Sequence, residues 1–375
     1  MRFDNAVIYA DDLRFHRGGF CVEKGRFANV LCSSADEPYI DLHGAYVLPG
    51  FIDIHCHGAM GSDFYESGVK QIEAMAKHWA SRGVTSFVAT AMTQSEDKLT
   101  VALKSAGAFA SQEYANSAVL RGVRLEGPFL SPARKGAQNG SYLRLPSIEL
   151  FDRLHASAKG MLRIIDLAPE LPGAIDLIEY ASKSCVVSLG HSDATYEQAK
   201  AAIAAGARHI THLCNAMQPM HHRAPGMIPA AAEAPNVSTE IIGDGKHVHP
   251  SMLRLLYRAF GEERICLISD ALSCCGVTDE GCMSGGQRVH TKDGLAYLDD
   301  GTIAGSSRDL FEVFQCVLRC GIPPEAAIRM CSCNPAHLIG AQDEVGCISG
   351  GKRADFIVCD NDFSRLGVYC AGNAV

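Results

Sequence analysis

The segment GFIDIHCHG, residues 50–58, joins a short apolar run to two histidines. Alternate residues of a strand share a face, so His55 and His57 would point the same way. Cys56 would then face the opposite side and serve as packing. Similar short apolar runs recur after this one and alternate with helical stretches. This alternation is typical of a parallel sheet built from βα units.

Eight apolar runs of this kind can be counted along the chain. They are FIDIH (51–55), TSFVAT (85–90), GVRLEG (122–127), RIIDLA (163–168), VVSLGH (186–191), HITHL (209–213), TEIIGD (239–244) and ICLISD (265–270). Eight βα units predict a (β/α)8 TIM barrel of the α/β class. An open doubly wound sheet is the alternative, although no G-x-G-x-x-G motif follows the first run. The clearest helix is expected over 194–205, with Asp193 as its N-cap.

The two chain ends have a different rhythm of short strands and turns. We therefore predict a small β-sandwich domain built from both termini, residues 1–48 and 343–375, around a barrel of residues 49–342. Beyond the eighth run, Asp293-Gly294 and Asp300-Gly301 are hairpin-turn signals. They predict a β insertion that follows the eighth barrel strand. A helix is expected after the insertion, over 308–320.

Composition narrows the class of protein. A net charge of −8 leaves no basic stripe for a nucleic-acid partner, although one local site could still bind a small phosphorylated substrate. The sequence contains no apolar run of signal-peptide or membrane-spanning length, so we expect a cytoplasmic protein with no membrane partner. The 16 cysteines include no C-x-x-C pair, and we expect buried thiols rather than a disulfide framework.

Polar residues that could bind a metal occur where the predicted strands end. They are His55, His57, Glu126, His191, His212 and Asp270. The strand ends of a barrel meet on one face, and imidazole with carboxylate suits Zn, Fe, Co or Mn. Each residue alone has a structural interpretation, such as a salt-bridged aspartate. Their shared placement instead favours a divalent metal site, whereas His209, on the face opposite His212, is expected to be structural.

Several motifs resemble those of one enzyme family. GFIDIHCHG is similar to the D-x-H-x-H-G opening of the amidohydrolase superfamily. The segments RLEGPFLSPARKGAQN, SLGHSDAT, THLCNAMQPMHHRAPG, DGKHVHP and ISDALS, in this order, resemble the motif series of N-acetylglucosamine-6-phosphate deacetylases. The tail GCISGGKRADFIV resembles the returning strands of the superfamily. The similarity runs from about Ala45 to Val358, which is nearly the whole chain.

The resemblance implies roles for the metal ligands and the catalytic group. Glu126, His191 and His212 would hold the metal that does the chemistry. His55 and His57 would hold a second metal with Glu126 as a bridge, so one or two ions per subunit are expected. Asp270 would be the catalytic acid and base.

The resemblance also implies how a phosphorylated sugar would bind. Asn215, the backbone of Ala216, and Arg223 from the neighbouring subunit of a homodimer would take the phosphate, and His247 would contact the sugar. Gln138 departs from the family pattern, because some relatives carry a histidine there that contacts substrate. An amide can still hydrogen-bond a hydroxyl group, so this contact is retained as an expectation.

The activity implied by the resemblance is metal-dependent hydrolysis of N-acetyl-D-glucosamine 6-phosphate to glucosamine 6-phosphate and acetate, a step of amino-sugar catabolism. The galactosamine epimer is an alternative substrate, because the motifs do not read the C4 hydroxyl. Another alternative is an amidohydrolase acting on a cyclic amide. Such enzymes usually bridge two metals with a carboxylated lysine, and no lysine ends a predicted strand here. A non-enzymatic barrel would have lost Asp270 or a ligand, and none is lost.

Overall fold

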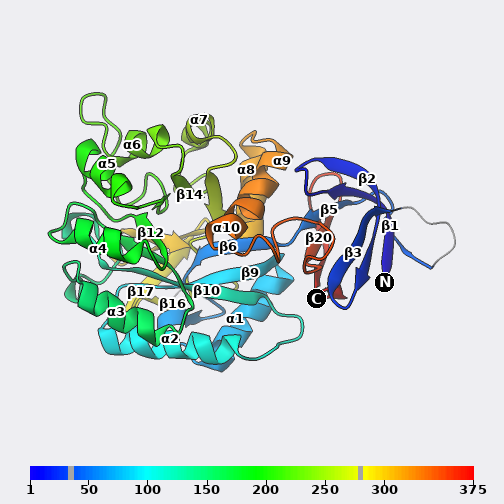
Figure 1. Cartoon of the computed structure of the whole chain (residues 1–375), viewed down its shortest axis with the longest axis horizontal. Coiled ribbons are helices and arrows are strands. Elements are labelled where there is room, and N and C mark those ends of the chain that lie inside the picture. Colours follow the sequence, from blue (N-terminus) through cyan, green and yellow to red (C-terminus); the bar gives the residue numbers. More distant parts are fainter. Residues whose placement is uncertain (33–37, 278–281) are drawn as a thin grey trace.

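The computed structural model describes residues 1–32, 38–277 and 282–375. It has two lobes, a large barrel surrounded by helices and a small β domain that carries both chain ends (Figure 1). In the described part of the chain, no helix is both long and apolar enough to cross a membrane.

The large lobe is a parallel barrel whose strands follow one another in chain order. Its strands are β6 (Phe51–Cys56), β9 (Val84–Ala91), β10 (Val119–Phe129), β11 (Leu162–Leu167), β12 (Val186–Leu189), β13 (His209–Ile210), β14 (Ser238–Ile242) and β15 (Ile265–Ile268). The segment after β15 closes the ring on β6. The backbone N–H of Asp270 donates to the carbonyl of His55 at 3.0 Å, and that of His57 donates to the carbonyl of Ala271 at 2.8 Å. The TIM barrel prediction is confirmed, and the open-sheet alternative is wrong.

Helices cover the outside of the barrel because each buries one apolar face against the strands. They are α1 (Val69–Ser81), α2 (Glu96–Ala110), α3 (Ile148–Ser157), α4 (Ala174–Ala181), α5 (Tyr196–Ala204), α6 (Met227–Glu233), α7 (Pro250–Phe260), α8 (Leu310–Arg319), α9 (Pro324–Cys331) and α10 (Cys333–Leu338). Single 3-10 turns occur at Phe64–Glu66, Pro132–Arg134 and Gly140–Tyr142.

The start of α5 differs from the prediction. Its N-cap is Thr195, whose hydroxyl accepts from the backbone N–H of Gln198, while the Gln198 side chain accepts from the N–H of Thr195. This reciprocal capping box satisfies two N–H groups that helix geometry leaves free. Asp193 therefore lies outside the helix, where it forms an ion pair with Arg134 at 2.7 Å.

Both chain ends build the small β domain, as predicted, and its strands form one continuous sheet. It contains β1 (Arg2–Tyr9), β2 (Phe15–Glu23), β3 (Arg26–Cys32), β4 (Ile40–Asp41), β5 (Tyr46–Pro49), β20 (Phe356–Cys359), β21 (Arg365–Cys370) and β22 (Asn373–Ala374). The antiparallel pair β5–β20 joins the two chain ends. The rings of Phe3, Phe20 and Phe356 pack together with centroids 4.9–5.2 Å apart and form the centre of its core. The exact domain boundaries stay a prediction.

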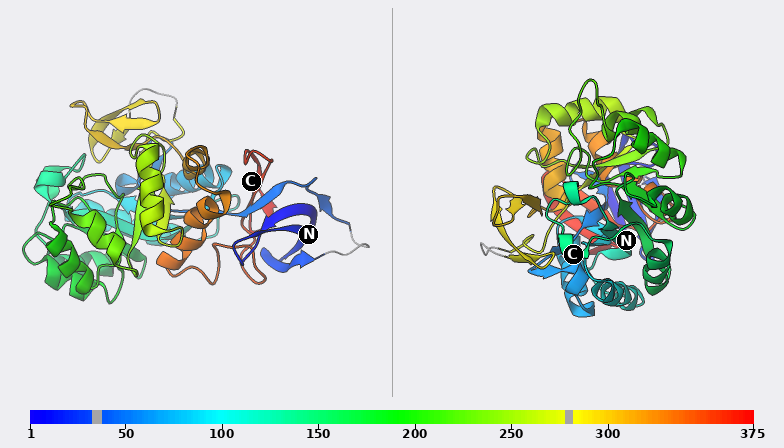
Figure 2. Two further views of the ribbon diagram at one scale, coloured as in Figure 1. Left: turned by 90° about the horizontal axis from the view of Figure 1, so that it is seen from above. Right: turned by 90° about the vertical axis from the view of Figure 1, so that its left-hand side faces the viewer.

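The β insertion lies beside the barrel as a separate layer (Figure 2, yellow). It contains β16 (Cys282–Ser284), β17 (Gln287–Lys292), β18 (Leu295–Tyr297) and β19 (Ile303–Ser306). Asp293 and Gly294, with φ of 55° and 87°, form the two-residue turn between β17 and β18 that the sequence predicted. Ser306 bridges to Ala271, so β19 ends next to the barrel opening. A short hairpin, β7 (Gly58–Ala59) and β8 (Ser62–Asp63), follows β6. The cysteines are free thiols throughout the described residues.

Candidate active site

Four histidines and one glutamate from different strands meet inside the barrel. Oε1 of Glu126 lies 3.0 Å from Nε2 of both His191 and His212, and these two nitrogens are 3.1 Å apart. Oε2 of Glu126 lies 3.4 Å from Nε2 of His57, which is 3.2 Å from Nε2 of His55. All five side chains are buried. They form two groups of three ligand atoms that share Glu126 and suit one or two cations.

The outer nitrogens of three of these histidines are held by hydrogen bonds. Nδ1 of His55 donates to Glu240 at 2.9 Å, while Nδ1 of His57 and of His191 donate to backbone carbonyls at 3.2 and 3.0 Å. A neutral imidazole has only one N–H, so in each ring Nε2 carries a lone pair. When the rings are neutral, these lone pairs face one another and a carboxylate, an arrangement that a cation between them would stabilise. The donor set therefore fits a divalent metal.

The charge of Glu126 suits this arrangement. Burial by itself would raise the pKa of this carboxyl group, but the nearby charges of His191 and His55 outweigh burial and hold the pKa well below its ordinary value. Glu126 is consequently a carboxylate at neutral pH. An ionised, buried carboxylate needs a positive partner, which a bound metal would supply.

The backbone is strained where it delivers the polar groups. His191, His212 and Asp270 have φ of 48°, 26° and 48°, and Ala216 has 50°. Such left-handed conformations are uncommon outside glycine and concentrate at functional sites. His191, His212 and Asp270 each come two residues after the end of a barrel strand. The strand end and the turn after it thus direct each side chain toward the shared centre.

Asp270 lies beside the two histidines of the first strand. Its Oδ1 is 3.2 Å from Nε2 of His57 and 3.6 Å from Nε2 of His55. Burial would raise the pKa of Asp270, but the charge of His55 and the hydrogen bond and charge of His57 lower it to about 2. Asp270 is therefore ionised at neutral pH and can accept a proton.

A pocket of about 340 Å³ opens over this cluster. Asn215, Ala216, His247 and Gln138 all line it, as do residues 302–305 of the β insertion, which the sequence did not single out. Nδ1 of His247 donates to Asp244 at 2.8 Å. Its Nε2 is buried and, within the described residues, has no hydrogen-bond partner. A buried polar atom left open in a pocket is suited to a ligand group.

Two residues predicted to bind substrate are placed differently from the others. The amide of Gln138 is committed to the protein, because its Oε1 accepts from the N–H of Thr93 at 2.8 Å and its Nε2 donates to Glu126. Its contact is thus with a candidate metal ligand. Arg223 lies exposed in the loop after β13, where it contacts His222 at 2.8 Å. Within one chain it does not line the pocket.

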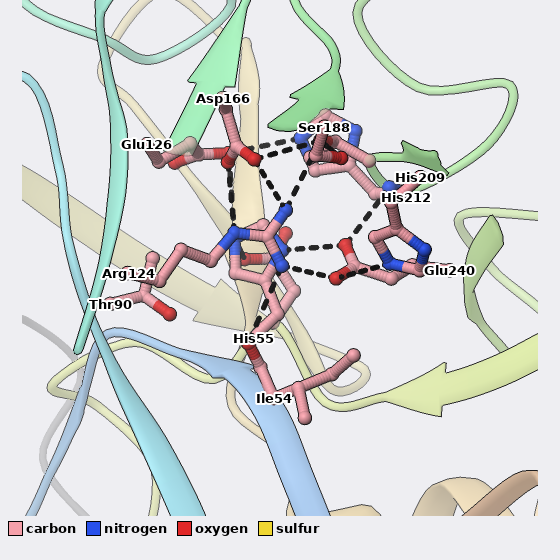
Figure 3. Close-up of polar contacts among 12 residues, drawn as sticks. Ile54, His55, Thr90, Arg124, Glu126, Asp166, Ser188, His209, His212 and Glu240 are labelled. Carbon is pink, nitrogen blue, oxygen red and sulfur yellow. Dashed lines mark hydrogen bonds and ion pairs between the residues drawn. The ribbon is translucent and has the colours of Figure 1, made fainter. Parts of the chain in front are cut away.

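A charged layer that sequence reasoning missed lies among the same strands (Figure 3). Arg124 is fully buried and donates to Asp166 at 2.9 Å through two nitrogens and to Glu240. Glu240 also accepts from His209 at 3.1 Å, so His209 belongs to this layer and not to the ligand cluster. The available signal was a charged residue within an apolar run, such as Arg124 two residues before Glu126 and thus on the same face.

The chain is similar to known proteins over nearly its whole length. The model of the Amidohydrolase family matches residues 46–375. An N-acetylglucosamine-6-phosphate deacetylase of Bacillus subtilis is 35% identical over 380 residues, which cover 99% of this chain and 95% of the relative. An N-acetylgalactosamine-6-phosphate deacetylase of Escherichia coli is also 35% identical, over 87% of this chain and 86% of that protein.

Solved structures agree with this similarity. The N-acetylglucosamine-6-phosphate deacetylase of Pasteurella multocida superposes with a TM-score of 0.93 at 33% identity, covering 100% of this chain and 99% of that one. A mutant of the Mycobacterium smegmatis enzyme in complex with N-acetyl-D-glucosamine-6-phosphate gives a TM-score of 0.92 at 30% identity, covering 100% and 98%.

Proposed function

Because the chain belongs to the amidohydrolase family and shares the fold of N-acetylglucosamine-6-phosphate deacetylases, we propose that it hydrolyses N-acetyl-D-glucosamine 6-phosphate to glucosamine 6-phosphate and acetate. The observation that carries this proposal is the convergence of Asp270 with the Glu126 and histidine cluster in one pocket. This reaction is a step of amino-sugar catabolism. A phosphorylated sugar is charged and crosses a bilayer poorly, so we place the enzyme in the cytoplasm with its substrate.

The proposed reaction needs a nucleophile, a proton acceptor and a proton donor. A divalent cation held by Glu126, His191 and His212 would lower the pKa of water toward ~7 and polarise the acetyl carbonyl. Asp270, ionised and next to the cluster, accepts a proton from the attacking water. It then delivers this proton to the sugar nitrogen, the C–N bond breaks, and acetate leaves. Zn, Fe, Co and Mn all suit these ligands.

Substrate recognition is proposed to rest on pocket-lining residues outside the ligand cluster. Asn215 and the backbone of Ala216 would take the phosphate, and the open Nε2 of His247 would accept a hydrogen bond from a sugar hydroxyl. Anchoring the phosphate positions the distant amide for attack. Gln138 would then act mainly through its hydrogen bond to Glu126, and any contact with the sugar would be secondary.

The test of this function is acetate release by the purified, metal-loaded protein from three sugars. We expect fast release from N-acetylglucosamine 6-phosphate and slow release from unphosphorylated N-acetylglucosamine. N-acetylgalactosamine 6-phosphate is the third substrate, because a relative named for that activity is also 35% identical, over 87% of this chain. A higher kcat/KM on the galactosamine epimer would reassign the substrate, and no release from either phosphosugar would refute the proposal.

An amidohydrolase acting on a cyclic amide is less well supported. In such enzymes a carboxylated lysine usually bridges two metals. Here Glu126 occupies the centre of the cluster, and no lysine is among the described residues that line the pocket.

Arg223 gives a prediction about phosphate specificity. We propose that it enters the pocket of the partner subunit in a homodimer and donates two parallel hydrogen bonds to the phosphate. A guanidinium suits this geometry better than an ammonium group. Arg223→Ala should then raise KM for the phosphosugar by about tenfold or more, while the poor rate on unphosphorylated N-acetylglucosamine should barely change. Arg223→Lys should recover only part of the affinity. Steady-state kinetics on both substrates measures this.

The subunit origin of Arg223 can be tested by mixing chains. Heterodimers of Arg223→Ala and Asp270→Asn chains contain one site that joins an intact Asp270 to an intact Arg223 from its partner. We expect such heterodimers to recover about half of the wild-type activity per dimer. A monomeric protein, or no recovery in isolated heterodimers, would contradict this arrangement.

A further inference from the structure

The charged layer described above lies next to the proposed metal ligands inside the barrel, two residues away from them along a strand. On β10, Arg124 and Glu126 are two residues apart and share the inner face of the barrel. Arg124, Asp166, His209 and Glu240 are all fully buried. TIM barrels normally fill such interior layers with branched apolar side chains. A layer of buried charges is costly unless every group is paired, so this one calls for a functional reason.

Glu240 is the group that links this layer to the ligand cluster. Its Oε2 accepts from Nδ1 of His55 at 2.9 Å and from the backbone N–H of His212 at 3.3 Å. Its Oε1 accepts from His209 at 3.1 Å and from Arg124. Both oxygens are thus held from several strands, as Figure 3 shows. The carboxylate can neither rotate nor leave His55 without breaking contacts on β10 and β13.

The contact between Glu240 and His55 fixes the ligand atom. Because a carboxylate only accepts hydrogen bonds, the proton of the neutral His55 ring is held on Nδ1. Nε2 is then the free lone pair, and it points toward His57 and Glu126. A carboxylate behind a ligating histidine also raises the basicity of the ring, which strengthens its bond to a metal.

The charges of the layer also favour a cation bound to His55. One guanidinium, that of Arg124, faces two carboxylates, those of Asp166 and Glu240. Asp166 accepts from two nitrogens of that guanidinium, whereas the carboxylate of Glu240 lies 2.9 Å from His55. The negative charge of Glu240 is therefore the one placed to attract a cation across a single imidazole ring.

We propose that Glu240, held by Arg124, is the positioning residue that makes the His55–His57–Glu126 group a metal site. This inference rests on the proposed metal-dependent function and deepens it, because it assigns what decides whether a second ion binds. Glu240 does not line the pocket, so it acts on the ion through His55 and not on the substrate.

The test is the Glu240→Gln variant, which keeps the shape and removes the charge. Metal per chain is measured by elemental analysis after equilibration with Co²⁺ in chelator buffers, and the visible absorption of Co²⁺ reports the ligand sets separately from activity. We expect wild type to bind two ions. The variant should bind the ion of the Glu126–His191–His212 group normally and the second ion about 10- to 100-fold more weakly.

Asp166→Asn is the matched control. Asp166 is an equally buried carboxylate that pairs with the same Arg124 but does not contact His55. It should lower the melting temperature without changing the affinity of the second ion. In addition, adding Glu240→Gln to a His55→Gln chain should cause no further loss of second-ion affinity, because Glu240 acts through His55.

Several results would overturn the inference. One is an affinity for the second ion that does not change in Glu240→Gln. Another is a loss of second-ion affinity in Asp166→Asn as large as that in Glu240→Gln. Should Glu240→Gln not fold, nitrogen NMR of histidine-labelled, Zn²⁺-loaded wild type decides instead. A proton on Nδ1 of His55 with the metal on Nε2 is expected, and a His55 ring that binds the metal through Nδ1 would refute the positioning role. A wild type that binds only one ion yet deacetylates the phosphosugar would refute this inference and leave the proposed function intact.

Discussion

The Asp270→Asn variant is expected to turn over N-acetylglucosamine 6-phosphate at least about 100-fold more slowly than wild type while still binding its metal. The amide matches the carboxylate in shape but cannot take the proton of water. Asp270 lies 3.2 Å from His57 and lines the pocket, unlike Glu240, the other buried carboxylate beside the cluster that is not assigned as a ligand. The measurement is kcat from acetate release, together with metal per chain.

The interpretation of this variant depends on what else changes. If Asp270 transfers protons, kcat falls and KM for the phosphosugar stays within a few-fold of wild type, because the phosphate contacts are untouched. A kcat within a few-fold of wild type would show that the proton acceptor has been misassigned. Loss of metal together with activity would instead indicate a ligand role.

Removing the metal is expected to lower turnover by at least about 1,000-fold, because the pKa of the attacking water would return from ~7 toward ~15.7. Dialysis against a chelator, followed by titration with Zn, Fe, Co or Mn, measures loss and recovery on one preparation. Full activity in protein shown by elemental analysis to be metal-free would contradict the mechanism. The identity of the ion that restores the highest kcat would assign the preferred metal.

The two groups of ligands are expected to respond unequally to substitution. His191 and His212 both lie 3.0 Å from Glu126, whereas His57 lies 3.4 Å from it. His191→Gln should therefore abolish turnover, while His57→Gln should cost less if the second ion is auxiliary. Equal losses in the two variants, with two ions per wild-type chain, would mean that both ions are required for the reaction.

Much of the fold and of the candidate site could be predicted from local patterns. Each barrel strand is a short apolar run that its own residues reveal, so all eight were located. The strand ends then placed His55, Glu126 and Asp270 on one face, because the C-terminal ends of all strands in a closed parallel barrel lie on the same face. The turn at Asp293-Gly294 was equally local, since both residues tolerate a positive φ.

Other features depend on contacts between distant segments. The N-cap of α5 was misplaced by two residues because Asp193 and Thr195 are both good caps. The capping box with Gln198 favours Thr195 locally, and the ion pair with Arg134, 59 residues earlier, holds Asp193 outside the helix. The amide of Gln138 could equally face a sugar or a carboxylate until the fold set Thr93 and Glu126 on either side of it.

The sequence by itself determined the barrel and the residue types of the candidate site, because apolar runs and the residues that end them are properties of neighbouring residues. The tertiary structure alone decided which nitrogen of each histidine faces the centre. The hydrogen bond from His55 to Glu240 joins residues 185 positions apart, and it exists only because barrel closure brings β6 and β14 to the same interior. A proton on Nδ1 or Nε2 leaves no trace in a sequence, since it depends on the acceptor that packing places beside the ring.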